Sequence, residues 1–144
     1  MTALQVIEKS ILIETLLSIP EILPLVDFGG QYKVFWEHVP QGMELPYIVV
    51  SQIMGGDDNS AQSRASDSTY KIIATTGDMS QAEAFANAIS TLHEKLPVVT
   101  RFTSIAAPYT TIEETTPIFD RIQVQNIPVF MIGGLYRLRL SITE

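Results

Sequence analysis

Residues 45–76 read LPYIVVSQIMGGDDNSAQSRASDSTYKIIATT, and the pattern of this stretch decides the fold class. It opens with PYIVVSQI and closes with TYKIIATT, two runs rich in the β-branched and aromatic residues that favour strands. Between them, residues 54–68 are small and polar, which predicts a loop longer than the usual hairpin connection of about two to five residues. Long loops often carry function, so this loop is the first candidate for a functional site.

Other strand patterns lie on both sides of this stretch. QYKVFWEHV precedes it at residues 31–39, and its short connection to the next run favours antiparallel neighbours among the first three strands. The C-terminal third predicts four more strands, of which the last alternates apolar and polar residues. These four runs are VVTRFTSI (98–105), YTTIEETT (109–116), RIQVQNI (121–127) and LYRLRLSIT (135–143).

Two segments carry the periodicity of amphipathic helices. Apolar residues recur at helical spacing over residues 4–16, and Pro20 stops this helix soon afterwards. The second helix begins at the capping box Ser80-x-x-Glu83 and ends before Pro97. The predicted fold is a single α+β domain over residues 1–144, a mainly antiparallel sheet packed against two α-helices.

The composition excludes several classes of protein. With 16 acidic against 9 basic residues, the net charge of −7 repels phosphate and argues against tight wrapping of nucleic acid. The absence of cysteine removes disulfides, thiolate catalysis and cysteine zinc sites, and fits a reducing cytoplasm. Charged residues such as Glu8, Lys9 and Glu14 interrupt the apolar N-terminal stretch, so no membrane-spanning segment is expected.

The search for catalytic chemistry finds little. His38 and His93 lie far apart and lack the spacing of paired metal ligands, so we interpret them as surface histidines. The sequence contains neither a Gly-x-Ser-x-Gly elbow nor a phosphate-binding Gly-x-x-x-x-Gly-Lys motif. We therefore predict a protein that is not an enzyme, with no cofactor and no metal site.

One short motif is similar to a metal-binding turn. GGDD, at residues 55–58, resembles the metal-binding turns of diguanylate cyclases and viral RNA polymerases, which need further carboxylates on neighbouring strands. Neither PYIVVSQIM nor TYKIIATT contains an acidic residue. Because exposed turns also favour glycine and aspartate, we interpret GGDD as an ordinary turn.

The order of these features resembles a family of structural proteins. A leading amphipathic helix, the strand LPYIVVS, a polar loop, the strand YKIIATT and the helix SQAEAFANAISTLHEKL follow one another as in the tail terminator, or tail completion, proteins of tailed bacteriophages. The related head-to-tail joining proteins share a short chain, a Leu-Pro-aromatic strand opening and an alternating final strand. The resemblance runs from Leu4 to Ser141, and the chain departs from the family pattern at Gly133-Gly134.

The resemblance implies a structural protein of the virion, located in the tail or neck region and assembled in the host cytoplasm. Family members form a ring, usually a hexamer, that caps the head-proximal end of the tail tube and ends its polymerisation. The implied partners are further copies of the chain, the tail tube protein, the neck or connector protein and, in contractile tails, the sheath protein. DNA would pass through the ring without sequence-specific binding.

On this hypothesis the long loop contacts something outside its own subunit. Its aspartates would face the lumen or meet basic residues of a neighbouring copy, on the final strand. A mobile hairpin tip with no partner is the alternative interpretation. The candidate residues are Gly55, Gly56, Asp57, Asp58, Asn59, Ser60 and Arg64 in the loop, and Arg137 and Arg139 in the final, ring-contact strand.

A second class of function stays open. The chain could be a small cytoplasmic ligand-binding or regulatory α+β domain that forms oligomers. Such a domain needs a pocket with a few converging polar groups, and no set of this kind stands out in the sequence.

Overall fold

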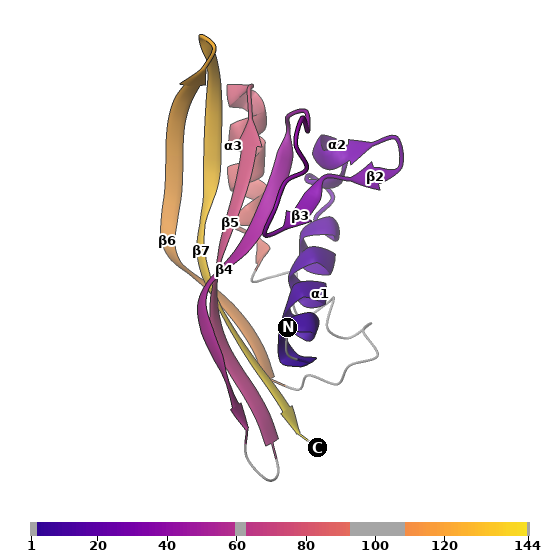
Figure 1. The fold of residues 1–144 in the computed structure, drawn as a ribbon, viewed down its shortest axis with the longest axis vertical. Helices are drawn as coiled ribbons and strands as arrows, with labels where there is room; N and C mark the ends of the chain where they lie inside the picture. The colour runs from indigo at the N-terminus through magenta and orange to yellow at the C-terminus, as the bar shows by residue number, and fades with distance from the viewer. Residues whose placement is uncertain (1–2, 60–62, 93–108, 144) are drawn as a thin grey trace.

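A computed structural model of the chain describes residues 3–59, 63–92 and 109–143, with side chains over residues 8–55, 67–92 and 112–139. Helices and a mainly antiparallel sheet make up these residues, which confirms the predicted α+β class. The helices are α1 (Ala3–Leu17), α2 (Leu23–Val26) and α3 (Met79–Ile89). They lie on one side of the sheet (Figure 1). None of the described helices is long and apolar enough to cross a membrane.

The main sheet has the strand order β3-β4-β5-β7-β6 within the described residues. Its strands are β3 (Val34–Trp36), β4 (Tyr47–Asn59), β5 (Ser63–Thr76), β6 (Tyr109–Val124) and β7 (Ile127–Thr143). A separate two-stranded sheet joins β1 (Asp27–Phe28) to β2 (Gln31–Tyr32). The single strand predicted over residues 31–39 is therefore divided between β2 and β3.

The pairing of β3 with β4 differs from the sequence prediction. These strands run parallel, with Val34 opposite Ile48 and Trp36 opposite Val50, whereas antiparallel neighbours were expected. The segment between them, residues 37–46, returns the chain to the end of the sheet from which β3 started. The prediction for β4 and β5 is correct, since these two strands are antiparallel.

The hairpin of β6 and β7 replaces two shorter strands of the prediction. Residues 109–116 and 121–127 were expected as separate strands, but β6 runs unbroken through residues 117–120. Gln125 and Asn126 form the turn to β7, with φ values of +53° and +66°. Positive φ at both central residues is the geometry of a two-residue type I′ turn, whose twist matches that of the flanking strands. The predicted strand over residues 98–105 lies outside the described residues.

One row of residues marks where the long strands change register. Gln52, Tyr70, Tyr136 and Glu114 pair in sequence across β4, β5, β7 and β6, and register shifts follow directly after Gln52 and after Glu114. Such irregularities increase local twist. The sheet accordingly twists along its length, so that its lower and upper parts differ in orientation (Figure 1).

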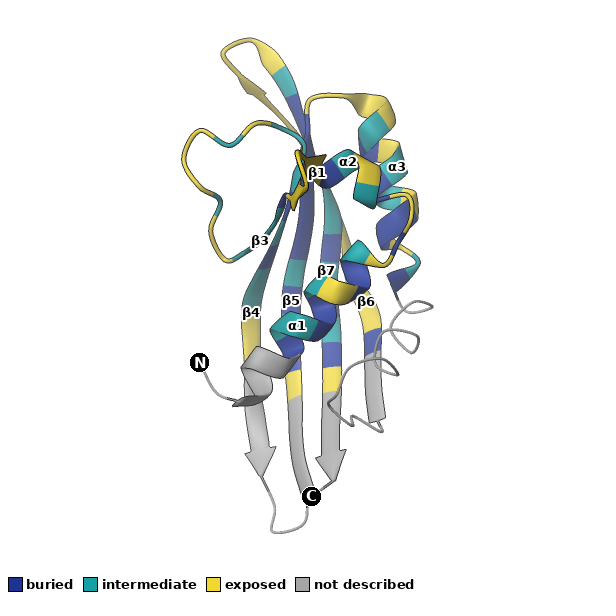
Figure 2. Ribbon diagram, turned by 90° about the vertical axis from the view of Figure 1, so that its right-hand side faces the viewer, coloured by how far each residue is buried: buried dark blue, intermediate teal, exposed yellow. Residues whose placement is uncertain are grey.

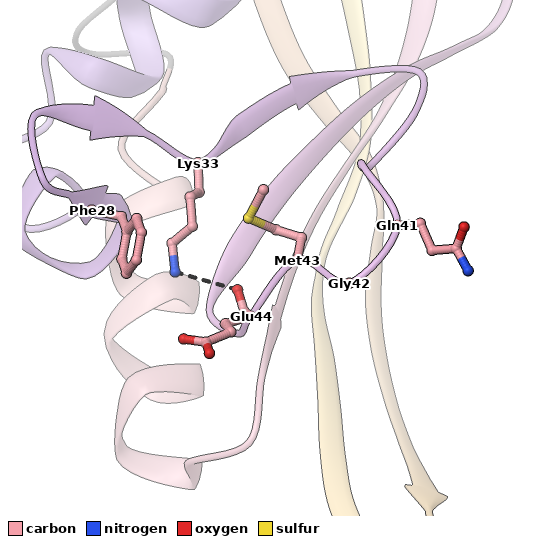
Figure 3. Close-up of a pocket in the computed structure, with 6 residues that line it drawn as sticks. All are labelled: Phe28, Lys33, Gln41, Gly42, Met43 and Glu44. Carbon is pink, nitrogen blue, oxygen red and sulfur yellow. Dashed lines mark hydrogen bonds between the residues drawn. The ribbon is translucent and has the colours of Figure 1, made fainter.

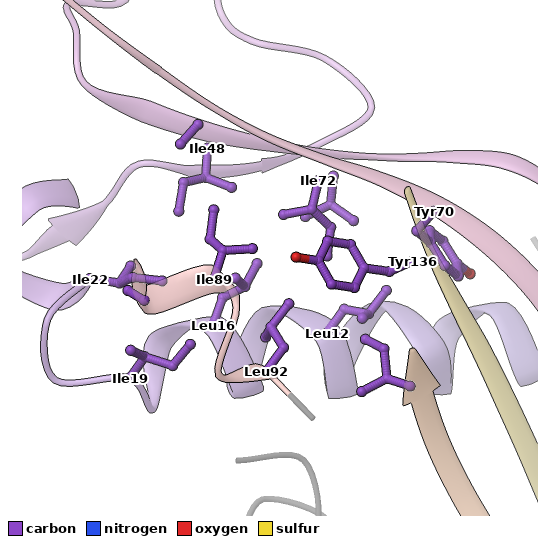
Figure 4. Close-up of a cluster of buried hydrophobic side chains, with 14 of the residues drawn as sticks. Leu12, Leu16, Ile19, Ile22, Ile48, Tyr70, Ile72, Ile89, Leu92 and Tyr136 are labelled. Carbon is purple, nitrogen blue, oxygen red and sulfur yellow. The ribbon is translucent and has the colours of Figure 1, made fainter. Parts of the chain in front are cut away.

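The hydrophobic core lies between the sheet and the helices α1 and α3. Burial follows the predicted stripes: Ile11, Leu12 and Leu16 of the first helix are buried, as are Ala82 and Phe85 of α3. Figure 2 shows buried residues along α1 and along the middle of the strands behind it. The cluster in Figure 4 joins Leu12, Leu16, Ile19, Ile22, Ile48, Tyr70, Ile72, Ile89, Leu92 and Tyr136.

The cap of α3 is one detail that the sequence pattern misplaced. Asp78, not Ser80, is the N-cap, because its carboxylate accepts a hydrogen bond of 2.8 Å from the backbone N–H of Ser80. The Ser80 hydroxyl donates to the same oxygen. The helix ends at Ile89, earlier than predicted, and the rest of the expected helix lies outside the described residues from residue 93 onward.

Glu8 is a charged residue inside the core. It is fully buried on α1 and accepts hydrogen bonds from the Ser68 hydroxyl, at 3.2 Å, and from the Tyr70 hydroxyl. Burial and the bond to Glu8 raise the pKa of Tyr70 far above its usual value. A buried carboxylate needs such donors, so this residue ties α1 to β5 by polar contacts within an apolar interface.

Candidate assembly surfaces

The predicted polar loop is largely an extension of the β4–β5 hairpin. Gly55 pairs with Ser68, Gly56 with Asp67, and the ladder continues to Asn59 and Arg64. The prediction of a loop over residues 54–68 was therefore wrong, and so was the interpretation of GGDD as a turn. Of the loop candidates, Gly55, Gly56, Asp57, Asp58 and Asn59 lie in β4 and Arg64 lies in β5, whereas Ser60 is outside the described residues.

The physical reason for this error is the neighbouring strand. Small polar residues have low strand propensity, but propensity is weak beside pairing with other strands. Residues 63–68 of β5 pair on their second side with residues 138–143 of β7. Residues 109–112 of β6 pair in turn with residues 138–141 of β7. The extension, which we call the arm (residues 54–59 and 63–68 with the paired parts of β7 and β6), is thus up to four strands wide. In Figure 1 it continues past the N-terminal end of α1.

Gly55 lies where a side chain would clash with Ser68 of the paired strand β5. A Cβ atom added there would lie 2.3 Å from the Ser68 hydroxyl oxygen and 2.7 Å from the Ser68 Cβ. The Ser68 side chain points into the interior, where it donates to Glu8. A side chain at residue 55 would therefore displace one of the donors that keep Glu8 satisfied.

Arg137 and Arg139 lie on β7 and share one carboxylate partner. Arg137 makes a bidentate contact with Asp67 of β5, with Nε–Oδ1 at 2.8 Å and Nη2–Oδ2 at 2.5 Å. The Nε atom of Arg139 lies 3.8 Å from the same Asp67 Oδ2. The hydrogen bond from Arg137 lowers the pKa of Asp67 and raises that of Arg137.

These contacts change the interpretation of the final strand. Both arginines already have a partner within their own chain, and their contact with Asp57 or Asp58 of another copy stays a prediction. The strand β7 also lies inside the sheet, between β5 and β6, and so offers no free edge for contact in a ring. Asp67 was overlooked because a single aspartate in a polar stretch gives no signal until its register with β7 is known.

The exposed end of the β6–β7 hairpin is apolar. Phe119, Ile122, Val124 and Ile127 have exposed fractions of 53%, 46%, 50% and 58%. Val124 pairs with Ile127, and Ile122 lies two residues before Val124, so these three side chains share one face of the hairpin. We call them the apolar tip. Contiguous exposed apolar residues of this kind mark interaction sites on soluble proteins.

The sequence carried a weak signal for this tip. RIQVQNI alternates apolar and polar residues, which predicts a strand with one buried face. The alternation does not say whether a second layer covers that face. In the described structure the hairpin continues past the helices to its turn (Figure 1), so the apolar face stays open.

One edge of the main sheet is formed by β4 wherever the short strand β3 does not cover it. The strand β3 covers β4 only opposite Ile48–Val50, and at its end the Glu37 carboxylate accepts a hydrogen bond of 3.0 Å from the Gln52 N–H. From Ile53 to Asn59, β4 has no strand neighbour on that side within the described residues. The strand β6 forms the other edge. Unpaired edges are sites where strands of another chain can add.

Metal ligands do not gather in the described part of the chain. No group of three or more histidine, aspartate or glutamate side chains is placed to hold an ion there. His38 lies in the connection between β3 and β4, and His93 is outside the described residues.

Comparison with known proteins adds no assignment. No model of a known protein family matches the sequence, and no curated protein matches it either.

Proposed function

We propose that this chain is a structural protein of a tailed bacteriophage that caps the head-proximal end of the tail tube. In this proposal several copies, six in the usual arrangement, form a ring that stops tube polymerisation and joins the tail to the neck or connector. DNA passes through the ring, and the protein carries out no catalysis.

The observation that carries the proposal is the arm of the sheet. Its strands continue beyond the helical layer and leave the edge of β4 from Ile53 to Asn59 without a strand neighbour among the described residues. An isolated domain gains little from such an extension, because exposed edges invite unwanted pairing. A subunit of a closed ring gains contacts with its neighbours, which cover the edges.

Two further features support an assembling protein. The apolar tip at the other end of the sheet offers a surface for a second contact. The order of helix, strands and helix along the chain resembles that of tail terminator proteins. Contact surfaces at opposite ends suit a subunit that bridges two neighbouring layers, such as the tube and the connector.

The test is electron microscopy of tail tubes. The purified protein is mixed with the polymerising tail tube protein of the same virus, and tube lengths and end rings are scored by negative stain. We expect short tubes with a ring at one end. Tubes that grow uncapped, as they do without the protein, would contradict the proposal and favour a small-ligand-binding domain instead.

A shortened arm gives the matched variant. Residues 57–66 are replaced by Asn-Gly, which joins the paired residues Gly56 and Asp67 by a two-residue turn. The core lies outside this segment, so the variant should fold, and its circular dichroism spectrum checks this. We expect it to lose capping. A double substitution of Asp57→Asn and Asp58→Asn separates the charge of the arm from its length.

A further inference from the structure

A small pocket beside the edge of the sheet contains a buried ammonium group. The pocket has a volume of about 290 Å³ and is lined by Phe28, Lys33, Gln41, Gly42, Met43 and Glu44. We call it the Lys33 pocket. Figure 3 shows the Lys33 side chain between Phe28 and the segment that carries Met43 and Glu44. Lys33 lies between β2 and β3, and its backbone N–H donates to Val26 at 2.8 Å.

The partners of the ammonium group are few for a residue that is only 7% exposed. Its Nζ atom donates to the Glu44 backbone carbonyl at 3.3 Å and lies 5.5 Å from the centre of the Phe28 ring. An ammonium has three donors, and removal from water is costly unless they are satisfied and the charge is compensated. Among the described residues, no carboxylate forms an ion pair with Lys33.

Glu44 is the residue that could have supplied that carboxylate. Its side chain is exposed, and it contacts Lys33 through its main-chain oxygen rather than through an ion pair. The chain as a whole carries a charge of −7, so its average field repels anions. The buried Lys33 ammonium, next to open pocket volume, is therefore a local positive charge in an acidic protein, and it favours binding of an anion in the pocket.

We propose that the Lys33 pocket binds a carboxylate carried on a short apolar stem. The carboxylate accepts hydrogen bonds from the Lys33 ammonium, and the stem packs against Phe28 and Met43. The volume of about 290 Å³ lies just below the range of ligand pockets, about 300–1,000 Å³, which suits a group the size of one amino-acid side chain. This inference is independent of the proposed role in tail assembly.

The test uses butyrate as the probe and butyramide as its neutral analogue. Each is titrated into the full chain, and binding is followed by amide chemical shifts in NMR spectra. We expect butyrate to shift residues around Lys33, and butyramide to bind about tenfold or more weakly, because it lacks the charge that strengthens the hydrogen bond. Absence of butyrate binding, or equal binding of butyramide, would overturn the proposal.

Two variants separate binding from structure. Lys33→Met keeps the apolar stem and removes the charge, so it should abolish butyrate binding and melt at the same or a higher temperature. Glu44→Gln removes a nearby competing carboxylate, so it should bind butyrate as well as or better than the natural chain. The alternative is that Lys33 serves only the fold, by pairing with Glu44 in solution. In that case both variants should melt at a lower temperature than the natural chain, and neither substitution should change butyrate binding.

The source of the carboxylate is decided by a second pair of probes. A short peptide with a free C-terminal carboxylate is compared with the same peptide as its C-terminal amide. Tighter binding of the free-acid peptide than of butyrate supports a protein chain end as the occupant. Binding of butyrate alone supports a small organic acid.

Discussion

Gly133 is the position in β7 where an added side chain would meet the closest backbone contact. An added Cβ would lie 1.8 Å from the Ile72 carbonyl oxygen of β5, a backbone atom that cannot move without disturbing the sheet. We expect Gly133→Ala to lower the free energy of unfolding by about 1–3 kcal/mol, as overpacking against a rigid neighbour does. Urea denaturation followed by circular dichroism measures this.

Gly77 provides the control for this substitution. A Cβ at Gly77 would meet its nearest atoms at 3.8 Å, an ordinary contact distance. Gly77→Ala should therefore change the free energy of unfolding by no more than about 0.5 kcal/mol. Equal effects at the two glycines would show that the close approach at Gly133 does not exist in solution.

The contribution of the Tyr70 hydroxyl to stability can be measured by a single substitution. Tyr70→Phe removes one hydrogen-bond donor from the buried Glu8, and we expect a loss of about 1–3 kcal/mol in unfolding free energy. Tyr136→Phe is the matched change, because the Tyr136 hydroxyl makes no hydrogen bond to another described residue. A larger loss at Tyr136 than at Tyr70 would contradict the role assigned to Glu8.

Asp67 gives the chain a predictable response to acid. The contact with Arg137 lowers its pKa in the folded state, so this pair stabilises the fold fully above the ordinary aspartate pKa of about 3.9. The contribution is lost as the pH falls through the lower folded-state pKa. Because the pair is exposed, we expect Asp67→Asn to cost only about 0.5 kcal/mol at pH 7.

The measurement compares unfolding free energies at pH 7 and near pH 2. The difference between Asp67→Asn and the natural chain should shrink towards zero at the lower pH. Asp120→Asn is the control, since Asp120 makes no ion pair with a described residue. A difference that stays constant with pH would mean that the substitution acts through packing instead.

At the scale of elements, the stability of the β6–β7 turn can be increased by substitution. Type I′ turns favour Asn-Gly, but the chain has Gln125 and Asn126 at the two positions of positive φ. Replacing them by Asn and Gly should raise the free energy of unfolding by about 1 kcal/mol, because relief of about 1–3 kcal/mol of strain at a non-glycine residue with positive φ exceeds the entropic cost of a glycine, about 0.5–1 kcal/mol. Thermal denaturation tests this, and no gain would mean that the turn has another geometry.

The sequence predicted those elements whose signal is contained in their own residues. The centres of β4 and β5 carry β-branched residues, and the buried stripe of α1 has helical spacing, so both could be identified. The arm could not, because its strand state depends on pairing with β7, which lies far away in the chain. The parallel pairing of β3 likewise depends on the path of residues 37–46.

The candidate site was predicted less well than the fold, for the same reason. Arg137 and Arg139 were selected by charge and alternation, but their shared contact with Asp67 follows from register between β5 and β7. The Lys33 pocket was missed because its residues come from the two-residue strand β1 and from the connections before and after β3, which are too short or irregular for periodicity to carry information.

At the scale of the whole molecule, charge should govern assembly. Each copy carries a net charge of −7, so copies brought together in a ring repel one another at low ionic strength. If the proposed ring forms, raising the salt concentration from about 50 to 500 mM should increase the fraction of rings on tail tubes. Tube ends scored at both salt concentrations test this, and fewer rings at high salt would mean that ion pairs hold the ring together.

The strand order also has a consequence for the newly made protein. In synthesis, β5 and β6 leave the ribosome before β7, yet β7 must lie between them before β6 can join the sheet. Until β7 emerges, the nascent chain exposes one side of β5 and the whole of β6, surfaces on which unfinished chains can pair with each other. Completion of the sheet is therefore a step that follows translation of β7, and truncation before residue 127 should yield aggregates rather than a smaller folded domain.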